Sequence, residues 1–292
     1  MRALVLGTGG FIGRELSKSL CDDARFKFVV MKHRFKEDIF VRFGDGGIGF
    51  TSNPDMNGEQ INEFDVIFNC QAWSRPQGDP QDIFYNNVNE PVAFLAELPQ
   101  YKKPPLFVHL SSIVVENYPL TTYAASKLCS ETVVKSFTEL GKIRGVVLRP
   151  CAVVGGNSTH GLIHDMVRKL KADRTKIEVL STKPGARKPF IHVNELVDLM
   201  VDLALNPLER SVCNDMDFRG PFSACSKNTL SVEQVLKTIF DALNVYPYPD
   251  LNWVGEKWTD QKEVGAITDF DMMTAEEAVA KAALETWEKI NV

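Results

Sequence analysis

Tyr123 and Lys127 are four residues apart, and the pair Ser111-Ser112 ends eleven residues before Tyr123. On a helix, residues four apart project from one face, one turn apart. The pKa of a free tyrosine is about 10, and a lysine ammonium beside the ring lowers it towards neutrality. Such a tyrosine can move a proton on or off a sugar or alcohol hydroxyl, and a nearby serine can hold the same oxygen. The set predicts interconversion of an alcohol and a carbonyl, which also requires a hydride carrier.

A glycine-rich turn at the start of the chain is suited to hold such a carrier. Gly7, Gly10 and Gly13 lie between an expected strand, Ala3–Leu6, and an expected helix, Ile12–Leu20. Glycines there permit a tight turn, close approach of the backbone to a pyrophosphate and close packing of helix on strand. The amides of the helix start would face the phosphates. We therefore expect a bound dinucleotide, with the following cofactor-binding residues: Gly7, Gly9, Gly10, Phe11, Ile12 and Gly13.

The end of the second expected strand, Phe26–Met31, bears on the choice between NAD and NADP. An NAD site usually has an acidic residue there for the ribose hydroxyls, whereas this chain has Lys32, His33 and Arg34. Cationic groups suit a 2′-phosphate. The sequence favours NADP over NAD, with Lys32 and Arg34 as further cofactor-binding residues.

The elements that must position these residues alternate between short apolar runs and helical patterns, which predicts βαβ units and a parallel sheet. Further strands are expected at Asp65–Cys70, Leu106–Leu110 and Gly145–Leu148, with a long helix over Thr122–Leu140. After Pro150 the pattern changes. The expected elements there are helices over Leu162–Lys171 and Val193–Leu205, a strand over Ile177–Leu180, a capping-box helix from Ser231 to about Leu243, and a last helix from Thr274.

The change of pattern near Pro150 predicts two domains. We expect residues 1–150 to bind the dinucleotide and to regain a segment at about 190–213. Residues 151–292 are expected to form mainly the substrate-binding domain.

The composition is that of an ordinary soluble enzyme. The 292 residues are 44% apolar and 24% charged, with a net charge of −5, which gives no reason to expect nucleic acid as a partner. No apolar run approaches the ~20 residues of a membrane span. The six cysteines are scattered, which favours reduced thiols and a cytoplasmic protein. His160 and His164 have a helical metal-ligand spacing without the glutamate of a His-Glu-x-x-His site, so no metal is expected.

Several motifs together resemble the extended short-chain dehydrogenase/reductase superfamily, and within it the nucleotide-sugar epimerase and dehydratase group. The motifs are Gly7-x-x-Gly10-x-x-Gly13, Asn87-Val88, Ser111-Ser112, Tyr123-x-x-x-Lys127, Arg149-Pro150, Ala186–Val193 and Thr229–Val232. The resemblance covers residues 1 to about 240. It implies an α/β fold, with a doubly wound parallel (Rossmann) sheet and a smaller C-terminal α/β domain that binds a nucleotide sugar. It also implies a homodimer that associates through the helix Thr122–Leu140.

The resemblance further implies a role for individual residues. Tyr123 would be the acid/base, Lys127 would bind the nicotinamide ribose beside it, and Ser112 would hold the substrate oxygen. Ser112 is preferred over Ser111 because Ser112-Ile-Val-Val115 matches the family's segment. Asn87 would lie on the cofactor side, and Arg187 would meet the substrate's diphosphate through a bidentate fork.

Three features depart from the family's pattern, besides the basic residues at the NAD position. Ile113 and Val114 replace the Asp-Glu pair of many dehydratases, which argues against 4,6-dehydration. Glu116 replaces a tyrosine. The segment from Ser112 to Tyr123 is much shorter than in most relatives, which predicts a more open sugar pocket.

Three hypotheses remain open at this point. The first is an NAD(P)-dependent epimerase that acts on a nucleotide-activated sugar through a keto intermediate. The second is an NADPH-dependent reductase of a keto-deoxysugar nucleotide. The third is a relative that binds the dinucleotide without turnover.

Overall fold

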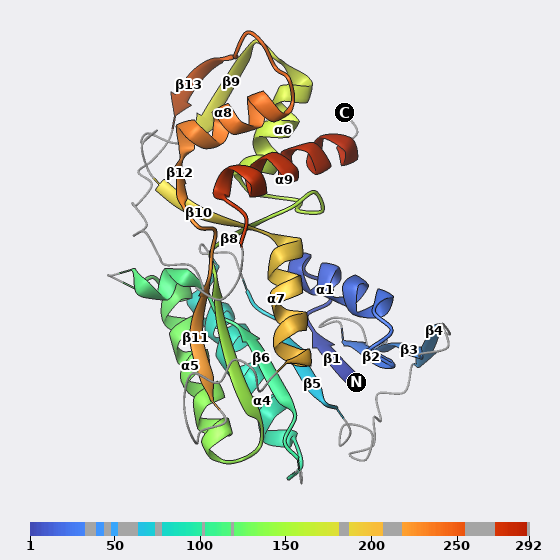
Figure 1. Cartoon of the computed structure of the whole chain (residues 1–292). Helices are drawn as coiled ribbons and strands as arrows, with labels where there is room; N and C mark the ends of the chain where they lie inside the picture. The colour runs from blue at the N-terminus through green and yellow to red at the C-terminus, as the bar shows by residue number, and fades with distance from the viewer. Residues whose placement is uncertain are drawn as a thin grey trace. The chain divides into compact units, whose positions relative to one another are not determined.

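The computed structural model describes residues 1–32, 39–43, 48–51, 64–73, 78–100, 103–117, 120–180, 187–206, 218–254 and 272–290. The chain forms two compact units (Figure 1). The first consists of Met1–Arg149 and Val197–Phe222, and the second of Pro150–Leu196 and Ser223–Val292.

A sheet of eight strands organises the first unit, in the order β11-β7-β6-β5-β1-β2-β3-β4. The strands are β1 (Arg2–Leu6), β2 (Phe28–Lys32), β3 (Ile39–Phe43), β4 (Ile48–Thr51), β5 (Val66–Asn69), β6 (Leu106–Leu110), β7 (Arg144–Pro150) and β11 (Arg219–Ala224). The five strands from β7 to β2 are parallel, and β3 and β4 continue the sheet antiparallel. The predicted parallel α/β sheet is therefore confirmed.

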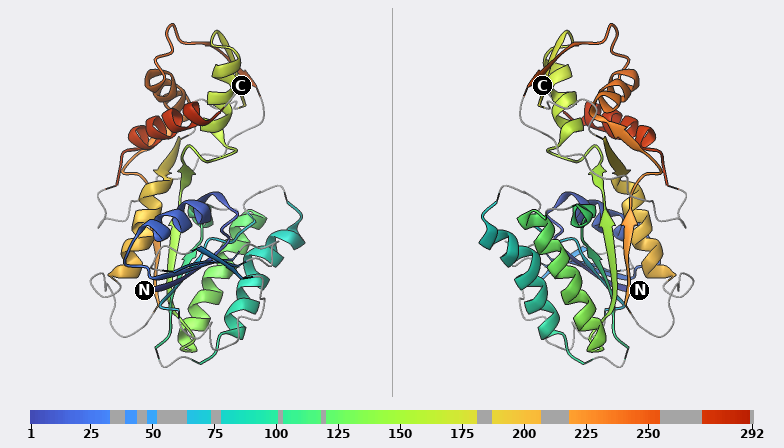
Figure 2. Two further views of the ribbon diagram at one scale, coloured as in Figure 1. Left: turned by 90° about the vertical axis from the view of Figure 1, so that its right-hand side faces the viewer. Right: turned by 90° about the vertical axis from the view of Figure 1, so that its left-hand side faces the viewer.

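Helices cover both faces of this sheet (Figure 2). On one face lie α4 (Glu90–Glu97) and α5 (Thr122–Glu139), and on the other α1 (Phe11–Asp22) and α7 (Val193–Leu205). Three shorter helical segments precede α4 and α5: α3 (Pro80–Phe84), the π-helix η1 (Tyr85–Asn89) and the 3-10 helix η2 (Ile113–Glu116). Because both faces are covered, the central strands are buried almost throughout, which explains their near-continuous apolar sequences.

Side chains of alternate strand residues form the core beneath α4 and α5. This core includes Leu4, Leu6, Ile67, Phe107 and Val147 from the strands, Leu95 from α4 and Val134 from α5. Each of these is at most 5% exposed, so this layer fixes how α5 lies against the sheet.

The second unit packs three helices around short strands. The helices are α6 (Leu162–Ala172), α8 (Val232–Ala242) and α9 (Ala275–Lys289). The strands β8 (Ala152–Val154), β10 (Arg187–His192) and β12 (Thr229–Ser231) form one sheet, and β9 (Lys176–Leu180) pairs in parallel with β13 (Asp250–Val254). The predicted capping box at Ser231 is confirmed, and Thr274, where the last helix was expected to begin, closes a second capping box.

The helices that the sequence predicts are present, most with bounds shifted by one or two residues. The short strands β8, β10 and β13, and the segments α3 and η1, were not predicted. None of the helices in the described part of the chain is long and apolar enough to cross a membrane. Among the described cysteines, Cys21, Cys70, Cys129, Cys151 and Cys225 are free thiols.

Candidate active site

The carboxyl ends of β1 and β5 mark the point where the strand order of the sheet reverses. The chain continues from β1 to β2 on one side, and β5, β6 and β7 extend the sheet on the other. In open parallel sheets, ligands bind at this point, in the crevice outside the carboxyl ends. The glycine turn and the residues after β5 and β6 all lie at this edge.

The glycine turn that follows β1 requires glycine at two positions. Gly7 has a φ of +83°, and a Cβ there would lie 2.7 Å from the backbone nitrogen of Gln71. A Cβ on Gly13 would lie 2.3 Å from the carbonyl oxygen of Gly7. Helix α1 begins at Phe11 with no side-chain cap and no acidic residue in its first turn. Its first amides can therefore meet an anion, and the turn fits the pyrophosphate of a dinucleotide.

The basic residues that favour NADP can be placed only in part. Lys32 ends β2 and pairs in register with Leu6 at the end of β1, so its backbone lies beside the glycine turn. The side chain of Lys32, and the whole of His33 and Arg34, lie outside the described residues. The preference for NADP stays a prediction.

Asn87, expected on the cofactor side, is buried in the π-helix η1 with its amide already engaged. Its Oδ1 accepts from the backbone nitrogen of Trp73 at 2.7 Å, and its Nδ2 donates to Ser126 Oγ at 2.9 Å and to the carbonyl of Trp73 at 3.3 Å. Asn87 thus ties the segment after β5 to α5, and its place on the cofactor side stays a prediction.

The predicted set of Ser112, Tyr123 and Lys127 is brought together at the end of β6. Ser112 caps η2 directly after the strand, and Thr121 caps α5, with its Oγ1 accepting from Ala124 at 3.1 Å. Tyr123 lies in the first turn of α5, close enough to the Ser112 side chain for the serine to influence its pKa. Lys127, one turn later, is buried and donates from Nζ to the carbonyl of Leu110 at 2.7 Å.

The electrostatics of Tyr123 differ from the expectation. Burial raises its pKa to about 12, and the polar Ser112 side chain nearby offsets only part of this increase. The prediction that Lys127 lowers the tyrosine pKa was wrong for the protein alone, because the ammonium is directed to the Leu110 carbonyl. Burial also lowers the pKa of Lys127 to about 8. At neutral pH Tyr123 is therefore a neutral phenol that can donate a proton.

A buried polar chain that sequence reasoning missed lies beneath Lys127. Ser130 Oγ donates to the carbonyl of Lys127 at 2.7 Å, so it accepts from His109 Nε2 at 2.9 Å. Nδ1 of His109 then accepts from Asn69 Nδ2 at 3.2 Å. Burial and the Lys127 charge hold the pKa of His109 well below its ordinary value, so the ring is neutral.

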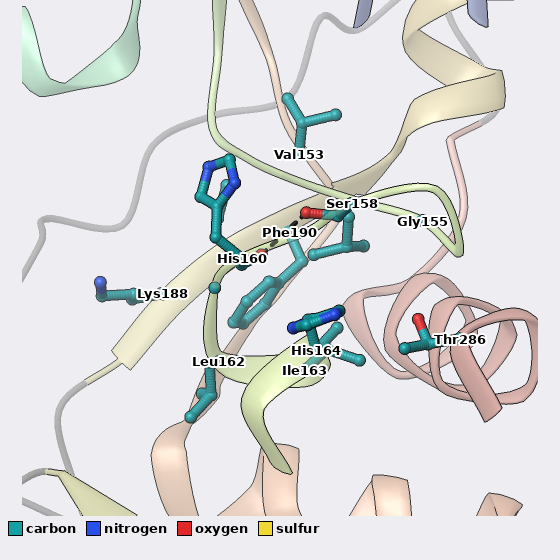
Figure 3. A pocket seen from close by; sticks show the side chains of 13 residues that line it. Val153, Gly155, Ser158, His160, Leu162, Ile163, His164, Lys188, Phe190 and Thr286 are labelled. Atoms are coloured by element: carbon teal, nitrogen blue, oxygen red, sulfur yellow. Dashed lines mark hydrogen bonds between the residues drawn. The ribbon is translucent and has the colours of Figure 1, made fainter. Parts of the chain in front are cut away.

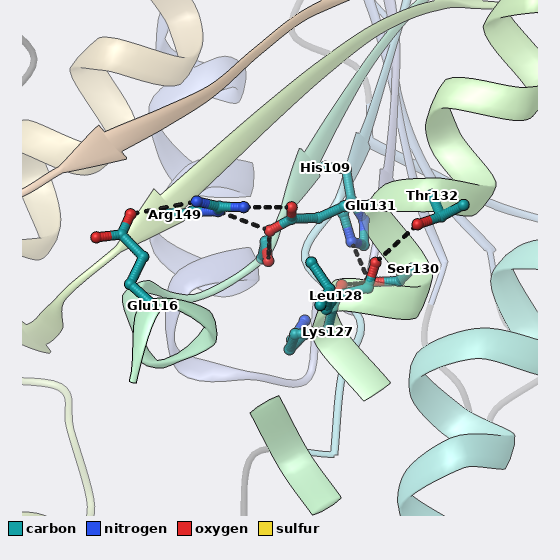
Figure 4. Close-up of polar contacts among 9 residues, drawn as sticks. His109, Glu116, Lys127, Leu128, Ser130, Glu131, Thr132 and Arg149 are labelled. Carbon is teal, nitrogen blue, oxygen red and sulfur yellow. Dashed lines mark hydrogen bonds and ion pairs between the residues drawn. The ribbon is translucent and has the colours of Figure 1, made fainter. Parts of the chain in front are cut away.

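A second missed group is an ion pair one turn further along the same face of α5 (Figure 4). Glu131, one turn after Lys127, is 7% exposed and accepts from Arg149 Nε at 2.9 Å and Nη2 at 2.7 Å. The spacing of Tyr123, Lys127 and Glu131, at intervals of four, was the available signal. Arg149 was noted only as part of an Arg-Pro motif.

The second unit contains a cavity of about 210 Å³ between β8, β10 and the start of α6 (Figure 3). Its lining includes Ser158, His160, His164, Lys188, Phe190 and Thr286. Lys188 contributes a basic group, and burial lowers its pKa to about 8. His160 precedes α6 and His164 lies inside it. No group of three metal-ligating side chains occurs among the residues that the structure describes.

Arg187, expected at the substrate's diphosphate, does not line this cavity. Its Nε donates to Thr229 Oγ1 at 2.9 Å and its Nη1 to Gln234 Oε1 at 3.2 Å. Neighbouring residues of a strand point to opposite faces, so on β10 it is Lys188 that reaches the cavity. The sequence analysis chose Arg187 because it matches an arginine in the family's motif, and it did not consider which face of the strand each side chain occupies. Lys188 was missed for that reason.

Comparisons with known proteins agree with this geometry. UDP-galactose 4-epimerase superposes with a TM-score of 0.74 at 21% identity, and RMD from Pseudomonas aeruginosa, complexed with NADPH, with 0.76 at 16%. UDP-glucuronic acid 4-epimerase from Bacillus cereus, in complex with UDP-glucuronic acid and NAD, gives 0.75 at 15%. In each case 99% of both chains is covered. These structures share the fold.

No curated protein sequence matches the chain significantly. The sequence profile of the NAD dependent epimerase/dehydratase family matches residues 3–214. That range includes the glycine turn, the Ser112, Tyr123 and Lys127 set and the whole of β10 and α7. The chain belongs to the NAD-dependent epimerase/dehydratase family.

Proposed function

We propose that this protein is an NAD(P)-dependent epimerase of a nucleotide-activated sugar. The observation that carries the proposal is that Ser112, Tyr123 and the buried Lys127 meet at the end of β6, where Lys127 is fixed by its 2.7 Å contact with the carbonyl of Leu110 and lies one helical turn from Tyr123. A nicotinamide dinucleotide, when bound, accepts a hydride from the sugar carbon and returns it. The glycine turn after β1 would hold its pyrophosphate, and the fold neighbours that were solved with NAD or NADPH support this choice.

In this mechanism the residues of the chain move one proton. Ser112 orients the sugar hydroxyl through its oxygen, and Tyr123 takes the hydroxyl proton as the carbonyl forms. Tyr123 must be a phenolate for this step, so the positive charge of the oxidised nicotinamide has to lower its pKa from the value of about 12 in the protein alone. The keto intermediate turns, and Tyr123 returns the proton to the same oxygen. The ammonium of Lys127 would stabilise the tyrosine anion, which is present before the first transfer and again after the second, whereas Tyr123 is a neutral phenol between the two.

The cavity in the second unit is proposed to bind the nucleotide part of the substrate. Lys188 would meet the diphosphate as a point charge, and Phe190 would provide an apolar wall. The fold neighbours with UDP-sugar substrates support this assignment. Residues 1–150 would then serve the cofactor and residues 151–292 mainly the substrate.

One observation favours the second candidate, an NADPH-dependent reductase of a keto-deoxysugar nucleotide. The raised pKa of Tyr123, about 12, suits donation of a proton to a carbonyl oxygen. Lys32, His33 and Arg34 support it through their charge. A reductase consumes NADPH, whereas an epimerase consumes no cofactor.

Three measurements separate these candidates. Absorbance of the purified protein near the reduced nicotinamide band tests for retained cofactor, and calorimetry with NAD and NADP ranks the two. Turnover of a panel of sugar nucleotides, with and without NADPH, follows. Interconversion without net NADPH consumption supports the epimerase, and stoichiometric consumption supports the reductase. If the protein binds the dinucleotide but turns over no sugar nucleotide, the third hypothesis, a non-catalytic relative, is supported.

We also propose that the protein is a homodimer. Leu128 on α5 and Leu140 at its C-cap are 39% and 64% exposed, and Cys129 is exposed between them in sequence. Light scattering on the wild type and on Leu128→Glu tests this association, and a monomeric wild type would contradict it.

A further inference from the structure

Helix α5 contacts three consecutive residues at the end of β6 with side chains from three consecutive turns. Tyr123 lies near the Ser112 side chain, and Lys127 donates to the carbonyl of Leu110. Glu131 completes the series, because its Oε1 accepts from Ser111 Oγ at 2.5 Å. The helix thus determines where the strand end, and with it Ser112, lies.

Arg149 extends this arrangement to the residues after Ser112. Its guanidinium binds both oxygens of Glu131 and also donates from Nη1 to Glu116 Oε1 at 3.2 Å. Glu116 is the last residue of η2, the 3-10 turn that Ser112 caps. Ser111 and Glu116 are therefore both anchored to one ion-paired group, which fixes the turn on either side of Ser112 (Figure 4).

We propose that Glu131, held by Arg149, is a positioning residue that sets the place of Ser112 and the charge of Lys127. The proposal rests on the proposed function of Ser112 and Lys127. Glu131 reaches neither the phenol of Tyr123 nor a reacting atom; it acts through Ser111, which precedes Ser112, and through its charge, one turn from the Lys127 ammonium.

Two physical arguments favour this role over a purely structural one. Burying an ion pair contributes little net stability, because desolvation cancels much of the attraction.

The charges that face Lys127 are also few. Burial lowers its pKa, while Cys70, which follows β5, and then the carboxylate of Glu131 oppose that effect. Burial raises the pKa of the Cys70 thiol to about 12, so this thiol carries no charge at neutral pH. His109, from β6, is neutral. Glu131 is thus the main fixed negative charge that keeps Lys127 protonated at neutral pH.

The test uses Glu131→Gln, which preserves shape and an acceptor for Ser111 but removes the charge. The control is Glu139→Gln, an exposed glutamate two turns later on α5. The titration of Lys127 is followed in the free protein through the NMR signal of its Cε, identified by its loss in Lys127→Met. We expect Glu131→Gln to lower the pKa of Lys127 by about half a unit or more, and Glu139→Gln to leave it unchanged. An unchanged Lys127 pKa in Glu131→Gln overturns the proposal.

A second variant separates position from charge. Ser111→Ala removes the Ser111 contact and leaves the Glu131–Arg149 pair intact. In an enzyme assay we expect its kcat to fall about ten- to a hundredfold with KM little changed, because Ser112 loses its fixed place. A wild-type kcat in Ser111→Ala overturns the positional part. If the wild type turns over no sugar nucleotide, the proposed function fails, while the Lys127 titration still decides on Glu131.

Discussion

The ammonium of Lys127 donates to the backbone carbonyl of Leu110 at 2.7 Å and lies in a buried site. This contact anchors α5 to the end of β6, but one hydrogen bond does not compensate for the removal of a charge from water. The pKa of Lys127 falls from 10.5 to about 8 for that reason. The buried charge of Lys127 therefore lowers the stability of the protein. A substitution that removes the charge should raise stability and remove activity.

We expect Lys127→Met to be more stable than the wild type at pH 7 and to lose activity. The pKa difference corresponds to a burial cost of about 3 kcal/mol, of which loss of the Leu110 hydrogen bond offsets about 1–2 kcal/mol. Between pH 8 and 10.5 the unfolded chain binds more protons at this position than the folded chain, so wild-type stability rises with pH. The advantage of Lys127→Met should shrink across that window in denaturant unfolding.

The control for this prediction is Lys135→Met, because Lys135 is exposed on the same helix. Its stability relative to the wild type should not change with pH between 8 and 10.5. A difference between Lys127→Met and the wild type that stays constant over this range would contradict the buried-charge interpretation.

Tyr123→Phe should abolish turnover while leaving the fold and dinucleotide binding intact. The variant removes the hydroxyl that exchanges the proton with the substrate, and general acid–base catalysis contributes about 10²- to 10⁴-fold. Tyr85→Phe is the matched control, since Tyr85 is 54% exposed in η1. Steady-state kcat for both variants, with cofactor affinity by calorimetry, checks the prediction. Equal activity of Tyr123→Phe and wild type would remove Tyr123 from the mechanism.

Gly13→Ala should destabilise the protein and abolish dinucleotide binding. The new Cβ would lie 2.3 Å from the Gly7 carbonyl oxygen, so either α1 or the turn must move. Gly10→Ala is the internal control, because its Cβ would lie 3.4 Å from the same oxygen and Gly10 has a φ of −79°. We expect wild-type thermal unfolding for Gly10→Ala. A Gly13→Ala protein that binds NAD(P) as the wild type does would show that the turn tolerates a side chain.

The sequence predicted the parallel sheet and its long helices because their signals are local. Leu106–Leu110 is a continuous apolar run and is found as predicted, since a strand covered on both faces needs no polar alternation. Thr121 and Ser231 cap helices through contacts within three residues. In contrast, β8 has only three residues, and its strand character comes from pairing with β10, which lies far along the chain.

The sequence predicted which residue types form the candidate site, but it did not predict the pKa values of Tyr123 and Lys127. The spacing of Tyr123 and Lys127 placed both on one face of α5. The direction of the Lys127 ammonium depends on the Leu110 carbonyl, a contact across 17 residues that no local pattern contains. Burial, which dominates both pKa values, is likewise a property of the packed fold.

Arg187 and Lys188 show the same limit within one strand. The side chains of adjacent residues in β10 point to opposite faces of the sheet. The pairing register of the strand therefore decides which of the two side chains lines the cavity. Arg187 pairs across to Ser231 in β12 and bonds to Thr229 and Gln234. Its side chain therefore anchors β10 to the start of α8.

Lys188→Met should weaken binding of a nucleotide diphosphate with little change in dinucleotide affinity. The ammonium is the basic group that we assign to the diphosphate, and loss of one charge-assisted contact is worth about 1.5–3 kcal/mol, or roughly ten- to a hundredfold in Kd. Because burial lowers the pKa of Lys188 to about 8, UDP binding by the wild type should weaken as the pH rises through 8. Binding by Lys188→Met should lack this pH dependence.

Calorimetry with UDP at pH 6.5 and pH 9 measures both effects. Lys176→Met is the control, since Lys176 is exposed on β9 in the same unit. Arg187→Met provides a second comparison. If Arg187 rather than Lys188 binds the diphosphate, Arg187→Met will lose UDP affinity while Lys188→Met retains both its affinity and the pH dependence of the wild type. That outcome would place the nucleotide outside the cavity of Figure 3.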